Sequence, residues 1–194
     1  MRPPRSVTAP DLRLAYYLLA GPRGRRTLAA AAGLSEMTTR TALARMQAVG
    51  WVAVDRRGTR LTPVGRAVLG PPLALVKGVV GLPGLEVSDH RPVEAALVAA
   101  APARPAWWYR DQAVRSGADL LILLRHAGGT FRFPETGEPL GAANPRDCPR
   151  LAGALPQAAS GDTLLLVGGP GRAGASAGLW AAVAGLLAPS SGRA

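Results

Sequence analysis

Residues 28–61 have the sequence LAAAAGLSEMTTRTALARMQAVGWVAVDRRGTRL, and this stretch decides the fold of the first third of the chain. The small-residue segment Leu28–Ala32 ends at Gly33, and a segment with helical periodicity then runs from Ser35 to Gly50. After Gly50 the hydrophobic period changes from that of a helix to that of a strand. The stretch therefore predicts two short helices joined by a tight turn and followed by a β-hairpin.

The second of these helices is predicted to be amphipathic. Ser35 suits the N-cap, because its hydroxyl can accept a hydrogen bond from an early backbone N–H. Thr39, Leu43, Met46 and Gly50 step by four, three and four residues, so we expect them on one buried face. The opposite face is then expected to carry Met37, Thr38, Arg40, Thr41 and Arg45.

The hairpin is predicted from two short strands with arginines between them. Residues 51–55 form the first strand, Arg56-Arg57-Gly58 the turn, and residues 59–61 the returning strand. Thr62-Pro63 then begins a helix that we expect to pass through Val64, Ala67 and Val68 and to end at Gly70, before Pro71.

A further helix is predicted before residue 28. Thr8-Ala9-Pro10-Asp11 has the pattern of a capping box, and Leu12, Ala15, Tyr16 and Leu19 follow on one face until Gly21. Residues 23–26 form a basic connector, after which Thr27 is expected to cap the helix at Leu28–Ala32. The predicted order is three helices, a basic hairpin and a helix.

In this order and with these residues, the segment from about 8 to 70 resembles the winged helix-turn-helix domain of prokaryotic transcription regulators. The resemblance implies that the third helix enters the major groove of DNA and that the hairpin, or wing, contacts the backbone or minor groove. Arg40 could bond a guanine edge, while arginines outside the helix would neutralise phosphates. The residues implied to bind DNA are Thr38, Arg40, Thr41 and Arg45 on the helix, Arg56, Arg57 and Arg60 on the wing, and Arg25 and Arg26 before it.

The charge of the chain is concentrated in the same region. Residues 1–70 hold twelve arginines against three acids, a net charge of +9, whereas residues 71–194 hold ten arginines and Lys77 against nine acids, a net charge of +2. A basic domain joined to a nearly neutral one is typical of proteins that bind a polyanion. A genome that favours arginine explains the choice of arginine over lysine, but it does not explain this asymmetry.

The composition excludes several classes of protein. Hydrophobic residues make up 48% of the 194 residues and charged residues 18%, which indicates a folded, globular chain. Cys148 is the one cysteine and there are two histidines, so we expect no metal and no cofactor. Residues 1–5 lead into no apolar signal segment, and the apolar runs are too short to span a bilayer; we expect a cytoplasmic protein with no membrane partner.

Residues 71–194 are predicted to form a small mixed α/β domain, so the whole chain is expected to be α/β in content and α+β in class. The expected domains are 1–70, which binds DNA, and 71–194, which binds an effector or dimerises. In the second domain, strands are expected near 74–80, 85–88, 119–125, 130–133 and 163–167, helices near 110–116, 150–155 and 177–187, and a polar loop at 134–149. The apolar run at 93–101 could be a buried strand or a helix, and a strand is favoured.

Two segments of the second domain could bind a ligand. Residues 169–174 match GxGxxG between a predicted strand and a helix, but no second strand or acidic ribose partner follows, which favours a plain glycine-rich loop. In the aromatic cluster after residue 106, Trp108, Arg110 and Asp111 could form the wall of a small-molecule effector pocket; the alternative is that the rings pack in the core. No nucleophile has a base beside it, so we expect no enzymatic activity.

The sequence therefore predicts a sequence-specific double-stranded DNA-binding protein and transcription regulator. We expect a homodimer, because one recognition helix and one wing contact only a few base pairs. The alternatives are a winged-helix adaptor that binds protein or RNA, and an enzyme in the second domain. Residues 110–134 also resemble the second domain of a group of uncharacterised archaeal winged-helix proteins, whose role is unassigned.

Overall fold

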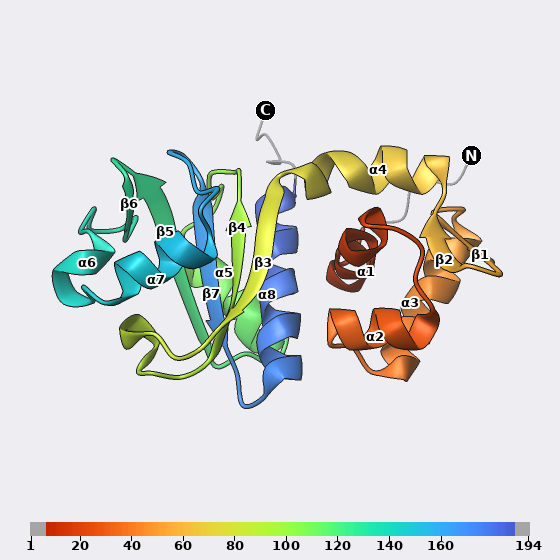
Figure 1. The fold of residues 1–194 in the computed structure, drawn as a ribbon, viewed down its shortest axis with the longest axis horizontal. Coiled ribbons are helices and arrows are strands. Elements are labelled where there is room, and N and C mark those ends of the chain that lie inside the picture. Colours follow the sequence, from red (N-terminus) through yellow and green to blue (C-terminus); the bar gives the residue numbers. More distant parts are fainter. Residues whose placement is uncertain (1–6, 189–194) are drawn as a thin grey trace. The chain divides into compact units, whose positions relative to one another are not determined.

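A computed structural model describes residues 7–188, and the chain divides into two compact units, Met1–Ala74 and Leu75–Ala194, called unit 1 and unit 2 below. Helices and antiparallel strands make up both units, so the fold class is α+β, as predicted. Figure 1 shows the elements along the chain. None of the described helices has the length and apolar character needed to cross a membrane.

Unit 1 has the predicted order of elements. The helices are α1 (Ala9–Leu19), α2 (Arg25–Ala32), α3 (Glu36–Ala48) and α4 (Pro63–Ala74), and the hairpin between the last two consists of β1 (Val52–Asp55) and β2 (Gly58–Leu61). The capping box of α1 is present at Thr8 and Asp11, and Ser35 caps α3. Local signals at the helix ends therefore predicted most boundaries to within a residue or two.

Two predicted helix ends in unit 1 are wrong. The helix α2 begins at Arg25 after Gly24, so Arg25 and Arg26 lie in its first turn and Thr27 is not its cap. The helix α4 continues through Pro71 and Pro72 to Ala74, which moves the boundary between the units from 70/71 to 74/75. Gly70 before the proline has no Cβ to clash with its ring, and the carbonyls that lose a partner belong to residues 67 and 68, which are exposed to water.

The buried face of α1 is wider than the sequence pattern predicted. Leu14 and Leu18 are fully buried, whereas Tyr16 and Leu19 are only half-buried. The reason is that α1 packs against α2, α3, α4 and β2, so several of its sides are covered. On α3, Thr39, Leu43 and Met46 are buried as expected, but Gly50 lies beyond the helix end and is exposed. On α4, Val64 and Val68 point to solvent, while Leu69 and Leu73 are buried.

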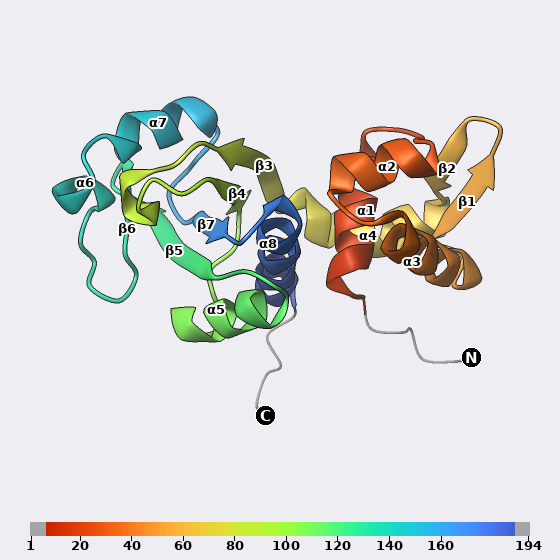
Figure 2. The same cartoon turned by 90° about the horizontal axis from the view of Figure 1, so that it is seen from below.

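Unit 2 is a five-stranded antiparallel sheet with the strand order β3-β4-β7-β5-β6. Helices α5 and α8 cover one face and α7 covers the other, as Figure 2 shows. The strands are β3 (Val76–Leu82), β4 (Val93–Val98), β5 (Leu120–Ala127), β6 (Thr130–Arg132) and β7 (Thr163–Gly168); the helices are α5 (Ala106–Arg115), α6 (Leu140–Ala143), α7 (Asp147–Ala154) and α8 (Arg172–Leu187).

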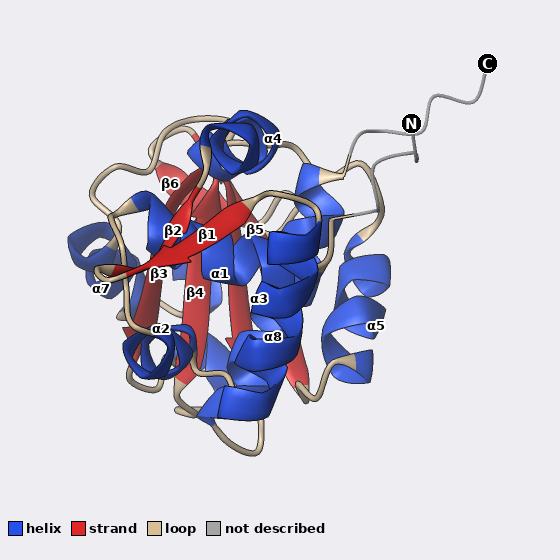
Figure 3. Cartoon of the chain, turned by 90° about the vertical axis from the view of Figure 1, so that its right-hand side faces the viewer, coloured by secondary structure: helices blue, strands red, loops and turns tan. Residues whose placement is uncertain are grey.

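Both faces of the sheet are buried, which explains its continuous apolar strands. All six residues of β7 are buried: Leu164 and Leu166 belong to a core cluster that includes Leu151 of α7, while the residues between them face the opposite side. The helices α5 and α8 lie next to each other on that opposite side (Figure 3).

Several predicted elements of unit 2 need correction. Residues 86–88 form a short 3₁₀ turn and not a strand, because the carboxylate of Asp147 accepts hydrogen bonds from the backbone N–H of Glu86 and Val87, in place of a neighbouring strand. The predicted loop at 134–149 contains α6 and the start of α7. The helices α5 and α8 begin at Ala106 and Arg172, earlier than expected, whereas β4 confirms the strand predicted from Val93.

Candidate nucleic-acid interface

The outer face of α3, made of Met37, Thr38, Arg40 and Thr41, is exposed. Ser35 determines where the helix begins, because its hydroxyl accepts a hydrogen bond from the backbone N–H of Thr38 at 3.1 Å and lies 2.9 Å from the Thr38 hydroxyl. The buried residues on the other side hold the helix on the rest of unit 1. Arg40 and Thr41 therefore project from a rigid helix into solvent.

Arg45 was predicted to lie with these residues, but its guanidinium is held against α1. It donates hydrogen bonds to Asp11 at 2.5 Å and to the hydroxyl of Thr8 at 2.7 Å. The side chain of Asp11 is only 1% exposed, and the same carboxylate accepts the backbone N–H and hydroxyl of Thr8. The capping box of α1 therefore also fixes the position of α3.

A shallow hollow of about 250 Å³ lies between the start of α1 and the outer face of α3. Met37, Thr38 and Thr41 line one side and Pro10 the other, with Arg45 between them. Met37 is 64% exposed, so the hollow has an apolar side chain open to solvent. This hollow brings apolar, hydroxyl and guanidinium groups together on one surface.

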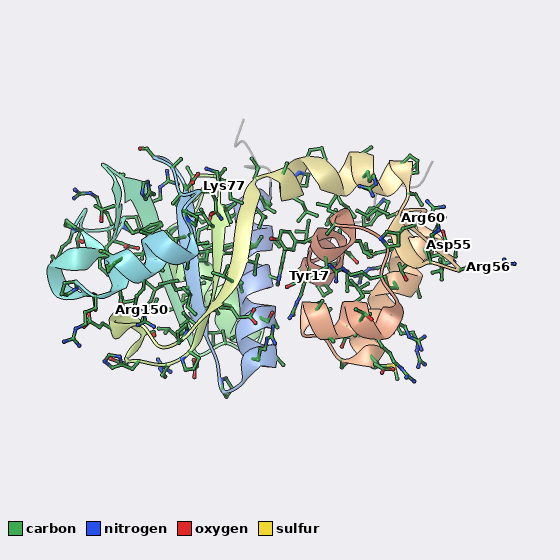
Figure 4. The ribbon with its side chains drawn as sticks, viewed as in Figure 1. Tyr17, Asp55, Arg56, Arg60, Lys77 and Arg150 are labelled. Carbon is green, nitrogen blue, oxygen red and sulfur yellow. The ribbon has the colours of Figure 1, made fainter. Side chains whose placement is uncertain are left out.

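The turn of the hairpin is organised by Asp55. Its carboxylate accepts the backbone N–H of Arg57 at 2.8 Å and the guanidinium of Arg60 at 2.9 Å. The hydrogen bond from Arg60, together with that from the Arg57 backbone, holds the pKa of Asp55 below its ordinary value. Arg60 is thus engaged within the hairpin, whereas the side chain of Arg56 extends away from its tip (Figure 4).

A third extended segment, which the sequence did not indicate, supports the hairpin. The backbone of Arg23 pairs with Thr59 through two hydrogen bonds of 3.0 and 2.9 Å. Gly58 makes this pairing possible: its φ is +112°, and a Cβ there would lie 2.6 Å from the carbonyl oxygen of Arg23. Because a single bridged residue has no periodicity, only the folded arrangement reveals it.

The acids of unit 1 are all used to hold arginines in place. Asp11 pairs with Arg45, Asp55 with Arg60, and Glu36 with Arg26 at 3.7 Å in an exposed contact. The remaining exposed arginines make no side-chain hydrogen bond or ion pair within the described part of unit 1; they are Arg25, Arg40, Arg56, Arg57 and Arg66. The surplus positive charge of unit 1 is therefore carried by exposed guanidinium groups that form no ion pair within its described residues.

In unit 2, the three predicted effector residues do not line one cavity. Trp108 packs between α5 and α8, against Gly185 and edge-to-face on Tyr109. Arg110 lines a hollow of about 450 Å³ together with Trp107 of the same aromatic cluster, and Asp111 is exposed.

A larger cavity of about 550 Å³ lies at the glycine-rich segment. Pro92, Val93 and Pro170 form apolar walls, and Arg91 and Arg172 are at its rim. Arg91 pairs with Asp119 and Arg172 with Glu94, each at 3.4 Å. All strand pairs of the described sheet are antiparallel, so this segment is not part of the β-α-β unit that a dinucleotide fingerprint requires.

Within residues 7–188, no three histidine, cysteine or acidic side chains gather as metal ligands. His126 and Cys148 do line one small hollow of about 130 Å³ in unit 2, a proximity that their separation in the sequence did not indicate.

Comparison with solved structures shows a likeness in fold. The chain resembles a solved structure of a hypothetical protein from Pyrococcus horikoshii, with a TM-score of 0.71 and 22% sequence identity over 93% of each chain. At this identity the likeness shows a shared fold and nothing about activity. No family model matches the chain, and no curated protein matches it.

Proposed function

We propose that this protein is a transcription regulator that binds double-stranded DNA through a winged helix-turn-helix domain in unit 1. One observation carries the proposal: α3 and the hairpin tip present exposed arginines that form no ion pair, while the three acids of unit 1 form ion pairs with other arginines. Such a surface is complementary to a duplex, because each phosphate it neutralises releases a counterion. The β-bridge between Arg23 and Thr59 of the hairpin also supports a winged-helix architecture.

The contacts within unit 1 divide the roles among the predicted DNA-binding residues. Arg40 and Thr41, free on α3, are proposed to contact base edges. Arg56 and Arg57 at the hairpin tip and Arg25 at the start of α2 are proposed to contact phosphates. Arg45 and Arg60 are proposed to act indirectly, since Asp11 and Asp55 hold their guanidinium groups within the protein.

The experiment is fluorescence anisotropy of labelled duplexes, including the DNA upstream of the protein's own gene, over a series of salt concentrations. We expect Arg40→Ala to weaken binding to the preferred sequence about tenfold or more and to reduce its preference over random DNA. We expect Arg57→Ala to weaken binding to all sequences alike and to lower the salt slope by about one.

Arg146→Ala is the matched control, because Arg146 is an exposed arginine of unit 2 and its contact with Glu86 at 3.7 Å is weak. It should leave the affinity unchanged. If the wild-type chain fails to bind any duplex at low salt, the proposal is wrong, and single-stranded RNA and acidic proteins become the partners to examine with the same variants.

The proposed regulator would use unit 2 to dimerise, to bind a small-molecule effector, or both. The cavity at the glycine-rich segment supports the effector, since its volume of about 550 Å³ suits a metabolite. Gly171 lines this cavity. Its φ is −171°, and a Cβ added there would have no atom within 4 Å, so neither backbone conformation nor packing requires glycine at this position.

A ligand held in this cavity should raise the melting temperature of the full chain, because it binds only the folded state. Screening metabolites that carry a carboxylate or phosphate by thermal shift tests this, with Gly171→Leu as the variant that fills the cavity. A shift that persists unchanged in Gly171→Leu would place the ligand elsewhere.

A further inference from the structure

The aromatic cluster at the start of α5 divides between the core and the surface. Trp108 and Tyr109 pack inward, next to Gly185 of α8, whereas Trp107 is 58% exposed. An indole ring is a large apolar surface, and tryptophan is enriched where proteins contact ligands and partners. Trp107 borders the hollow of about 450 Å³ described above, which is called the α5 hollow below.

One wall of the α5 hollow belongs to the start of α5. The chain that enters this helix is fixed, because the hydroxyl of the buried Tyr109 accepts the backbone N–H groups of Ala103 and Arg104 at 3.0 and 3.3 Å. Trp107 and Arg110 are three residues apart, so they lie on the same side of the helix. Both side chains therefore border the hollow from one rigid element.

The opposite wall comes from the turn that follows β6. Two backbone hydrogen bonds close this turn: the N–H of Gly137 donates to the carbonyl of Phe133 at 2.8 Å, and the N–H of Phe133 donates to the carbonyl of Glu138 at 3.0 Å. Phe133 and Glu135 line the hollow from this turn, and Ile122 of β5 also lines it. The hollow thus has apolar side chains from a helix, a strand and a turn.

Two opposite charges border this apolar surface without being paired. Arg110 and Glu135 are both exposed and both line the α5 hollow. Within residues 7–188 neither forms an ion pair, although four other acids of unit 2 do. The hollow therefore offers a guanidinium for an anion, a carboxylate for a cation, and apolar side chains for an uncharged group.

We propose that the α5 hollow binds a free α-amino acid with a large apolar side chain. The guanidinium of Arg110 donates to the carboxylate of the ligand, because its planar fork matches a carboxylate. Glu135 accepts hydrogen bonds from the ammonium group. The apolar side chain of the ligand packs against Trp107, Ile122 and Phe133. A volume of about 450 Å³ lies within the range of small-molecule sites.

The two charges favour this class over other small ligands. A carboxylic acid or a phosphate would use Arg110 but would bring a second negative charge toward Glu135. An amine would use Glu135 but would bring a second positive charge toward Arg110. A zwitterion with one apolar group satisfies both residues, so the hollow discriminates by repulsion as well as by attraction.

The first test is isothermal titration calorimetry of the full chain with phenylalanine, leucine and three matched probes. 3-Phenylpropanoate lacks the ammonium group, phenethylamine lacks the carboxylate, and alanine lacks the large side chain. We expect phenylalanine or leucine to bind, and each probe to bind about tenfold or more weakly than phenylalanine, since each loses a charged hydrogen bond or the apolar contact. The inference is wrong if neither amino acid binds, or if a probe binds as tightly as phenylalanine.

The second test assigns the charges with variants. Arg110→Ala and Glu135→Gln should each weaken phenylalanine binding about tenfold or more. Glu135→Gln should not weaken the binding of 3-phenylpropanoate, because it removes a like charge. The matched controls are Arg115→Ala on α5 and Glu138→Gln after β6, since both residues are exposed and neither lines the hollow. Controls that weaken phenylalanine binding as much as the test variants would overturn the assignment.

This site is separate from the cavity at the glycine-rich segment and from DNA binding, so the proposals can fail independently. Gly171→Leu should leave phenylalanine binding unchanged; binding that Gly171→Leu abolishes and Arg110→Ala does not would place the ligand in the other cavity and overturn the inference. A chain that binds phenylalanine but no duplex retains the α5 site and loses the DNA-binding proposal. Duplex binding without amino-acid binding does the reverse.

Discussion

Unit 1 and unit 2 use their charged residues differently. In unit 1 twelve arginines face three acids, so pairing each acid leaves exposed arginines in excess. In unit 2 the charges are nearly balanced, and four acids pair with basic residues within the unit: Lys77 with Asp162, Arg91 with Asp119, Arg146 with Glu86 and Arg172 with Glu94. The charges of unit 2 therefore mainly serve its own structure, whereas unit 1 keeps an excess of positive charge on its surface, as the proposed binding of a polyanion requires.

The largest expected effect is on folding stability, and it comes from replacing one buried acid in each unit. Asp11 and Asp162 have side chains 1% and 5% exposed, and each accepts a hydrogen bond from a cation and from a backbone N–H. We expect Asp11→Asn and Asp162→Asn each to lower the free energy of unfolding by about 2 kcal/mol, below the ~3–5 kcal/mol of a fully buried pair because Arg45 and Lys77 keep some contact with water. Calorimetry of the full chain measures this.

DNA binding separates these two variants. Asp11→Asn releases Arg45 and loosens α3 on α1, so it should weaken duplex binding even where the protein remains folded. Asp162→Asn should leave DNA affinity unchanged when measured well below its melting temperature. Equal losses of affinity in the two variants would contradict the assignment of DNA binding to unit 1.

A smaller effect is expected from pH at the hairpin. The pKa of Asp55 is lowered in the folded chain, so its carboxylate stabilises the hairpin fully above the ordinary pKa of about 3.9 and loses this effect as the pH falls through the lowered value. We expect the NMR titration of the Asp55 carboxyl to have its midpoint below that ordinary value, and Arg60→Ala to move the midpoint upward. Because Asp55 is exposed, the change in overall stability should be small.

An unchanged midpoint in Arg60→Ala would mean that the backbone N–H of Arg57 alone determines the pKa of Asp55. Arg60 would then be available for DNA, and the division of roles among the wing arginines would change accordingly.

Much of unit 1 could be predicted from the sequence because its signals are local. Thr8, Ser35 and Thr62 mark helix starts through hydroxyl groups that cap backbone N–H groups within three residues. The arginine-rich turn lies between two short strands, so it indicated the hairpin. One exception is α4, which passes through two prolines; the carbonyls left without partners belong to exposed residues, so water can bond to them.

Unit 2 was predicted less completely because its structure depends on distant contacts. Leu85–Ser88 has the composition of a strand, but Asp147, some sixty residues away, binds its backbone N–H groups. Trp108 could equally have faced a ligand, and its contact with Gly185 decided otherwise. No periodicity within β5 indicates that β6 covers only half of it.

The sequence by itself determined the class of the fold, the order of elements in unit 1 and the asymmetry of charge, because caps, turns and composition act over a few residues. Only the tertiary structure decided which arginines are free. Arg40 and Arg45 lie on one helix and differ only in whether a buried carboxylate of another helix lies within hydrogen-bonding distance. How much of β5 has a neighbouring strand on each side was decided in the same way, since β7 pairs with residues 120–125 and β6 with residues 125–127.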